Sequence, residues 1–178
     1  MTADNGGARP DADGSPPQGR RRGDRASARR PETTFPTVRV AAIQATPVIL
    51  DVEGCVEKAE LLLNEAADRG AQLAVLPECF IPLYPSNAWA TSAAGFSGWD
   101  ELWERMWANS VDVPGPHLDR LAAVCRKRAL FCAVGVNERE SSRPGTLYNT
   151  VAYIGPSGLL ARHRKLMPTQ HERPVSYT

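Results

Sequence analysis

From Val38 onward, short apolar runs alternate with longer amphipathic segments, and this alternation limits the folds that the chain can adopt. Apolar runs of strand length occupy residues 38–45, 72–76 and 130–136. Apolar side chains at helical spacing occupy residues 52–66, 99–107 and 116–125. Strands separated by helices are typical of an α/β fold, in which helices pack on a sheet.

The ends of these segments carry capping and turn residues. Asp51 is a suitable N-cap for the first helix, and Gly70 a suitable residue to end it. Residues 147–154 and 159–164 are two further strand-like runs. The turn between them, residues 155–158, is short enough to require an antiparallel hairpin. We therefore predict a mixed sheet.

The composition is that of a globular protein with one domain. The chain has 178 residues, of which 42% are hydrophobic and 23% charged. No apolar run approaches the roughly 20 residues that span a bilayer, so no membrane partner is expected. The net charge of +1 gives no reason to expect a nucleic-acid partner.

Residues 1–36 differ from the rest. They hold seven arginines and five acids but almost no large apolar side chains, so we predict a disordered Arg/Pro/Gly-rich tail. A domain should follow over residues 37–178. Arg20-Arg21-Arg22 resembles part of an export signal, but Gly23-Asp24-Arg25 replaces the apolar stretch that such a signal needs. We expect a cytoplasmic protein.

Glu78 ends an apolar strand, after Pro77, and this makes it a candidate catalytic residue. A carboxylate at such a position is costly unless it is solvated, paired or used. A solvated carboxylate is the ordinary interpretation. The functional interpretation is a general base whose pKa is tuned by burial and by a nearby cation.

Lys165 belongs to a basic cluster, residues 162–165, which is typical of a solvated strand end. Strand alternation nonetheless predicts that Lys165 lies on the same face as His163 and opposite Arg164. A lysine that points into a cleft can stabilise the negative charge that develops at a tetrahedral centre.

The segments around these two residues resemble the nitrilase (carbon-nitrogen hydrolase) family. The first runs from Gly70 through Glu78 to Tyr84-Pro85, and the second is Arg164-Lys-Leu-Met-Pro-Thr169. The resemblance covers about residues 38–173. Leu83 departs from the pattern, because many members have glycine before Tyr-Pro.

The resemblance implies a catalytic set of glutamate, lysine and cysteine. Glu78 and Lys165 match the first two, and Glu172 matches a second glutamate that orients the lysine and the substrate. Tyr148-Asn149-Thr150 also matches, and we assign it packing and strand hydrogen bonding. The implied fold is a four-layer α-β-β-α sandwich, of which this chain would supply the N-terminal half.

The implied reaction needs no metal or organic cofactor. A thiolate attacks a nitrile or amide carbon, the glutamate moves protons, and the lysine stabilises the tetrahedral states. The nitrilase-like branch, which converts a nitrile to a carboxylic acid and ammonia, is favoured by residues 81–85 and the tryptophan-rich segment after them. An amidase is the alternative. Cysteine and histidine spacings also give no support for a metal site.

No cysteine in the chain matches the family nucleophile. Cys55, Cys125 and Cys132 lie among apolar neighbours and are expected to be inert. Cys79 adjoins Glu78, but neighbours on extended backbone point to opposite faces. In the family the nucleophile follows the lysine motif, so we expect it beyond Thr178.

The sequence is consistent with three interpretations of the chain. The chain is part of a nitrilase-like hydrolase, or a short inactive product that serves as a binding or assembly subunit, or a small α/β binding domain. The first two expose a sheet face that later strands would cover, which favours association. Full-length relatives are expected to form homo-oligomers. The tryptophan-rich stripe would serve as core or subunit packing, or as a pocket wall.

Overall fold

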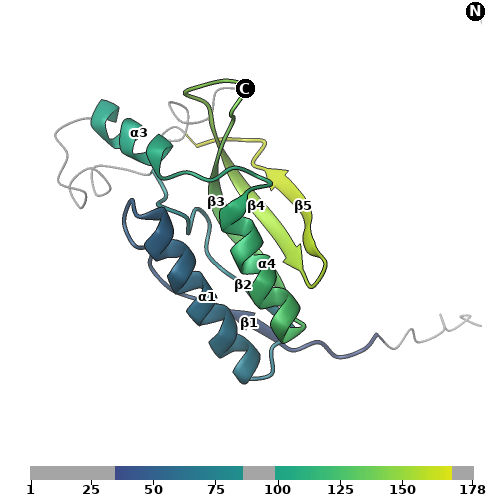
Figure 1. Cartoon of the computed structure of the whole chain (residues 1–178). Coiled ribbons are helices and arrows are strands. Elements are labelled where there is room, and N and C mark those ends of the chain that lie inside the picture. Colours follow the sequence, from purple (N-terminus) through teal and green to yellow (C-terminus); the bar gives the residue numbers. More distant parts are fainter. Residues whose placement is uncertain (1–34, 86–98, 170–178) are drawn as a thin grey trace, which may run out of the picture. The chain divides into compact units, whose positions relative to one another are not determined.

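The computed structural model describes residues 35–85 and 99–169. These residues form three helices and five strands (Figure 1). The helices are α1 (Val52–Asp68), α3 (Trp99–Ala108) and α4 (Pro116–Arg128). The strands are β1 (Val40–Ala42), β2 (Leu73–Val75), β3 (Phe131–Arg139), β4 (Leu147–Gly155) and β5 (Gly158–Arg164). Most of the predicted tail lies outside the described residues.

The five strands form one mixed sheet in the order β1-β2-β3-β4-β5. The pairs β1–β2 and β2–β3 are parallel, and the pairs β3–β4 and β4–β5 are antiparallel. The predicted mixed sheet and its final hairpin are therefore confirmed. Strand β1 is shorter than predicted, and β3 is longer because its register with β4 continues through Asn137 and Glu138 to Arg139.

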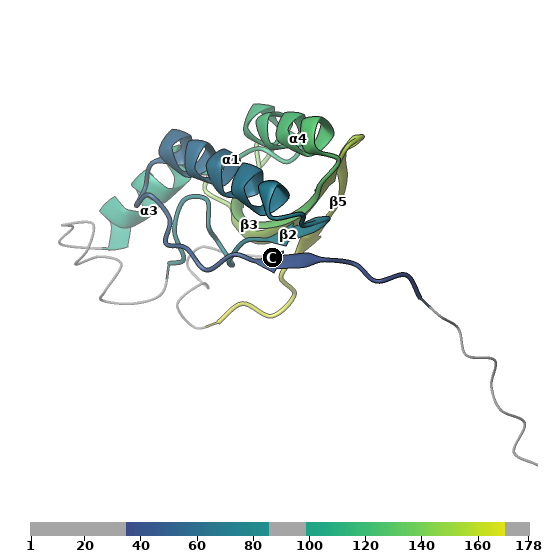
Figure 2. The ribbon, with the colours of Figure 1, turned by 90° about the horizontal axis from the view of Figure 1, so that it is seen from below.

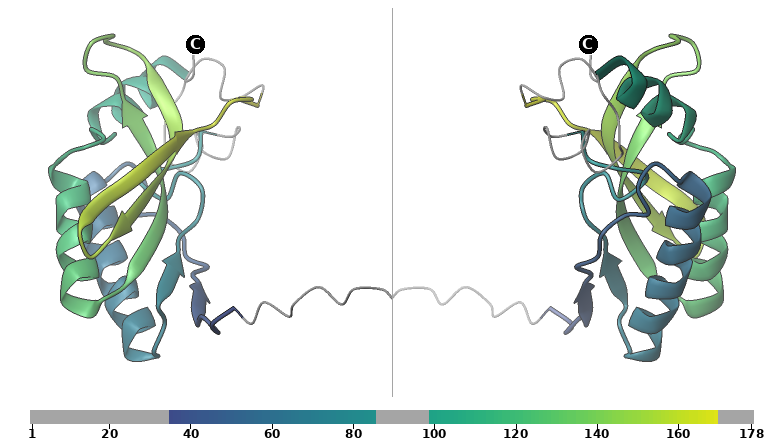
Figure 3. Two further views of the ribbon diagram at one scale, coloured as in Figure 1. Left: turned by 90° about the vertical axis from the view of Figure 1, so that its right-hand side faces the viewer. Right: turned by 90° about the vertical axis from the view of Figure 1, so that its left-hand side faces the viewer.

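Helices α1 and α4 lie side by side on one face of the sheet (Figures 2 and 3). Their apolar stripes, such as Ala59 and Leu63 of α1 and Leu121 of α4, are fully buried in the main core. The facing side chains of β3, Cys132, Val134 and Val136, complete this core. Burial of each large side chain contributes about 1.5–3 kcal/mol, so this face holds the domain together.

The ends of α1 follow the predicted capping residues. The Asp51 side chain accepts a hydrogen bond of 2.9 Å from the Gly54 backbone N–H, as an N-cap does. Gly70 lies beyond the last turn with φ +79°, a left-handed conformation that favours glycine. These two residues stop the helix at both ends and direct the chain into β2.

Helix α3 belongs to a second, smaller core. Leu102 and Met106 are buried against Leu83 and Leu147, with Trp103 and Trp107 packed at the edge. The tryptophan-rich stripe thus packs in the interior of the domain, which is one of the functions predicted for it.

The other face of the sheet exposes large apolar side chains. Val40, Val75, Phe131 and Tyr153 are 51%, 39%, 48% and 41% exposed. Among the described residues no helix covers this face (Figure 3). One sheet and one helix layer make up half of the predicted four-layer sandwich. None of the helices in residues 35–85 and 99–169 is long and apolar enough to cross a membrane.

Candidate active site

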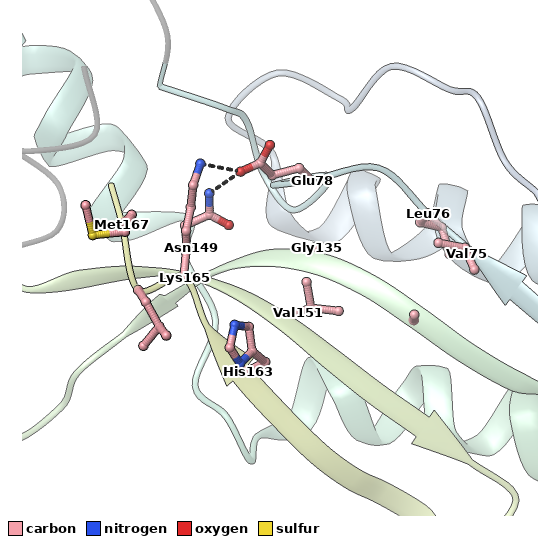
Figure 4. A pocket seen from close by; sticks show the side chains of 11 residues that line it. Val75, Leu76, Glu78, Gly135, Asn149, Val151, His163, Lys165 and Met167 are labelled. Atoms are coloured by element: carbon pink, nitrogen blue, oxygen red, sulfur yellow. Dashed lines mark hydrogen bonds and ion pairs between the residues drawn. The ribbon is translucent and has the colours of Figure 1, made fainter. Parts of the chain in front are cut away.

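A hollow of about 540 Å³ opens on the uncovered face of the sheet (Figure 4). Its polar lining comes from Glu78, Asn149, His163 and Lys165, and its apolar lining includes Val151. These residues come from the segment after β2, from β4, and from β5 and its end. The hollow therefore collects side chains that are far apart in the sequence.

Glu78 is positioned by a backbone segment that runs against β3. The Leu76 N–H donates to the Ala133 carbonyl at 2.9 Å, and the Gly135 N–H donates to the Pro77 carbonyl at 3.2 Å. The approach is close enough to require glycine at position 135. A Cβ there would lie 2.4 Å from the Pro77 oxygen and 2.6 Å from the Glu78 Cα.

Lys165 directly follows β5, and its backbone N–H donates to the Asn149 carbonyl at 2.8 Å. Its Nζ lies 2.9 Å from Oε1 of Glu78. The two side chains are 30% and 50% exposed, so this ion pair contributes less than about 1 kcal/mol to stability. The ion pair therefore adds little to the stability of the fold, although it brings the two groups together.

Tyr84 and Thr169 lie beside this pair. The Tyr84 ring centre is 5.6 Å from Nζ of Lys165, within the range of a cation–π contact. The Tyr84 hydroxyl lies 3.2 Å from Oγ1 of Thr169. The Tyr-Pro segment and the lysine motif, which carried the family resemblance, are thus in contact with each other.

Asn149 has a contact that the sequence did not reveal. Its amide donates to Oε1 of Glu78 at 2.6 Å, so Asn149 and Lys165 converge on one oxygen (Figure 4). The sequence predicts only packing and strand hydrogen bonding for Asn149. Strand alternation places it on the same face as Val151, but its partner depends on the tertiary structure.

Glu172 lies outside the described residues. Among residues 35–85 and 99–169, no group of three or more His, Cys, Asp or Glu side chains is arranged to hold a metal ion. His163 is the histidine that lines the hollow, on the same side of β5 as Lys165.

All four cysteines of the chain are buried. Burial raises the pKa of Cys55 and of Cys125 from 9.0 to about 11, and it raises the pKa of Cys132 as well. Cys79 is 1% exposed and has φ +47°, so the chain turns sharply directly after Glu78. Buried thiols with raised pKa values are poor nucleophiles.

We expect a thiol reagent at pH 8 to leave the folded chain almost unmodified and to react with four thiols after unfolding in urea. The folded pKa values of Cys55 and Cys125 exceed 9.0, so their contribution to stability is complete below pH 9. That contribution should decline as the pH rises from 9 towards 11. Thiol counting and urea titrations across this range would check both results, and rapid labelling of one native thiol would contradict the assignment.

A sequence profile of the carbon-nitrogen hydrolase family matches residues 39–177. The chain belongs to this family. Its relatives include a bifunctional nitrilase/nitrile hydratase of Lupinus angustifolius, 43% identical over 143 residues. They also include an aliphatic nitrilase of Sinorhizobium fredii, 43% identical over 138 residues. These alignments cover 79% and 76% of this chain but only 40% and 44% of the relatives.

Solved structures of amidases share the fold. An amidase from Nesterenkonia aligns with a TM-score of 0.55 at 22% identity, covering 79% of this chain and 47% of the amidase. An N-terminal amidase aligns with a TM-score of 0.58 at 17% identity, covering 77% and 30% of the two chains. The predicted family and fold are confirmed, and this chain spans about two fifths of the length of the nitrilases that it matches.

Proposed function

We propose that Glu78 and Lys165 are two of the three catalytic residues of a nitrilase, which converts a nitrile to a carboxylic acid and ammonia. The observation that supports this assignment is the 2.9 Å contact between Nζ of Lys165 and Oε1 of Glu78 in a solvent-open hollow. The similarity to proteins named nitrilases supports the substrate class. Glu172 is the candidate for a second glutamate near the lysine.

In the proposed reaction, Glu78 accepts the proton of a cysteine thiol while the sulfur bonds to the nitrile carbon. The nitrogen takes up the proton, and the product is a thioimidate. Water adds to this carbon, the carbon–nitrogen bond breaks, and ammonia is released. The remaining intermediate is a thioester. A second water, deprotonated by Glu78, releases the acid and restores the thiol. Lys165 stabilises the negative charge of each tetrahedral state.

We propose that the thiol comes from a segment outside these 178 residues, because all four cysteines of the chain are buried. A cysteine nucleophile is also consistent with a structural relative. In another structure of the Nesterenkonia amidase, acrylamide has added to the active-site cysteine of that enzyme. Assembly of the full-length protein into homo-oligomers and a cytoplasmic location are parts of the same proposal.

A chimaera tests this function directly. Residues 38–169 of this chain would be joined to the C-terminal part of the Sinorhizobium fredii nitrilase, with which the chain shares 43% identity. We expect the chimaera to release ammonia and acid from an aliphatic nitrile, and the 178-residue chain alone to release none. A chimaera that folds but hydrolyses only amides would favour the amidase branch.

The uncovered apolar face favours a second candidate, a binding or assembly subunit without activity of its own. Phe131 and Tyr153 are exposed there, and apolar patches of this kind mark association surfaces. A folded chimaera that hydrolyses neither nitriles nor amides would support this candidate over the nitrilase.

A further inference from the structure

A buried carboxylate joins three strands on the face of the sheet that lies opposite the hollow. Glu138 of β3 is 1% exposed. It accepts hydrogen bonds from Oγ1 of Thr150 on β4 at 2.7 Å and from Arg162 on β5 at 2.5 Å. Arg164 on β5 binds it twice, at 3.1 Å and 2.7 Å. We call Glu138, Arg162 and Arg164 the Glu138 clamp.

The clamp and the candidate active site occupy opposite faces of the same strands. Thr150 alternates with Asn149 along β4, and Arg164 alternates with Lys165 at the end of β5. All three clamp residues line a separate polar hollow on the clamp side, whereas Asn149 and Lys165 line the candidate active site. The clamp can therefore influence Lys165 through the backbone, without contact with a substrate.

Arg164 is the last residue of β5, directly before Lys165. The pairing of β4 with β5 ends at Thr150 and Arg164, and one further backbone bond holds the N–H of Lys165. Beyond it, Leu166 and Met167 are 79% and 81% exposed. The position of Lys165 thus depends on how firmly its neighbour is held.

Arg164 is held from three sides. Besides its two bonds to Glu138, it donates to Oε2 of Glu140 at 3.1 Å, and its guanidinium stacks 3.8 Å from the centre of the Tyr148 ring. A bidentate, stacked guanidinium has a fixed direction, unlike a single-point contact. The buried carboxylate in turn needs the arginines, because an unpaired buried charge is costly.

We propose that the Glu138 clamp positions Lys165 next to Glu78 by fixing the end of β5. Arg164 and Glu138 are positioning residues, since they act through the backbone of the neighbouring residue. The inference rests on the proposed function only for the importance of Lys165. The geometry of the clamp can be tested without any turnover.

Amine labelling measures this effect, because the chain has just three lysines, Lys58, Lys127 and Lys165. The purified 178-residue chain would be treated with trace acetic anhydride, and the label at each lysine quantified by mass spectrometry. We expect Arg164→Met to raise the labelling rate of Lys165 about three- to fivefold relative to the other two lysines, the upper part of the range expected for loss of one partly exposed ion pair. Glu138→Gln should give a smaller rise in the same direction.

Two further variants separate positioning from general loosening. Glu78→Gln breaks the ion pair directly, so adding Arg164→Met to it should cause no further rise. Arg69→Met removes an exposed arginine that bonds Glu65 in the helix layer, with no lysine beside it in the sequence, and should leave all three rates unchanged. Circular dichroism and urea midpoints would establish that each variant is folded. If Arg164→Met does not fold, Glu138→Gln replaces it as the test of the clamp.

Three results would overturn the clamp. The labelling rate of Lys165 could stay unchanged in folded Arg164→Met, or labelling could rise equally at all three lysines. The rise could also add to that caused by Glu78→Gln. These outcomes do not depend on hydrolysis. If the chimaera fails to hydrolyse nitriles while the Lys165 rate rises as expected, the clamp stands and the proposed function fails.

Discussion

Replacement of Glu78 by glutamine should reduce nitrile hydrolysis by the chimaera about 10²–10⁴-fold, the usual contribution of a general base. A carboxamide cannot accept the thiol proton, although it has nearly the same size as the carboxylate. Lys165→Met should reduce the rate about 10²–10³-fold, because it removes the cation that we propose stabilises each tetrahedral state. Initial rates of ammonia release would measure both effects.

Matched controls use residues of the same types on the helix layer. Glu65→Gln removes a carboxylate that is 55% exposed on α1, and Lys127→Met removes an exposed ammonium on α4. Both variants should hydrolyse the nitrile at the rate of the parent chimaera. If Glu78→Gln retained more than a tenth of the parent rate, Glu78 would not be the general base.

Gly135→Ala should destabilise the domain by about 3 kcal/mol, at the upper end of ordinary overpacking. The new methyl group would meet the Pro77 oxygen, the Cys79 nitrogen and the Glu78 Cα at 2.4–2.6 Å. All three are backbone atoms and cannot rotate away, so the segment that carries Glu78 must move. Urea unfolding of the 178-residue chain would measure the loss of stability.

Gly135→Ala should also lower the rate of nitrile hydrolysis by the chimaera about 10²-fold. A displacement of a catalytic group by roughly 1 Å reduces the rate by about that factor. Gly155→Ala on β4 is the matched control. The three atoms nearest to its methyl group would be side-chain atoms of Phe131 and Leu160 at 2.9–3.0 Å, and these side chains are exposed enough to shift. A Gly135→Ala variant as stable and active as Gly155→Ala would contradict the close approach of the Pro77–Cys79 backbone to Gly135.

Local sequence patterns were sufficient for most of the fold. The Asp51 cap, the helical spacing after it and the short turn at residues 155–158 are all decided by neighbours in the chain, and each predicted element is present. The first strand was predicted over residues 38–45 from its apolar character. Only Val40–Ala42 pairs, because β1 is an edge strand with one neighbour, the equally short β2.

Less of the candidate site than of the fold could be predicted from the sequence. Glu78 and Lys165 were recognised from motifs 87 residues apart, and alternation indicated which face Lys165 occupies. The Asn149 contact and the Glu138 clamp were missed because they depend on the register of three strands. Glu138 lies beyond the strand predicted over residues 130–136, yet it is 1% exposed because β4 and β5 bring donors to it.

The strands of the sheet lie side by side in the order in which the ribosome makes them. Every strand after the first therefore finds its neighbour already synthesised, and pairing can advance from the N-terminus without waiting for distant sequence. Lys165 follows the fifth strand, so the lysine is the last of the paired groups to arrive. Glu78 and Asn149 are synthesised before it, so the three groups can meet only after the end of β5 has left the ribosome.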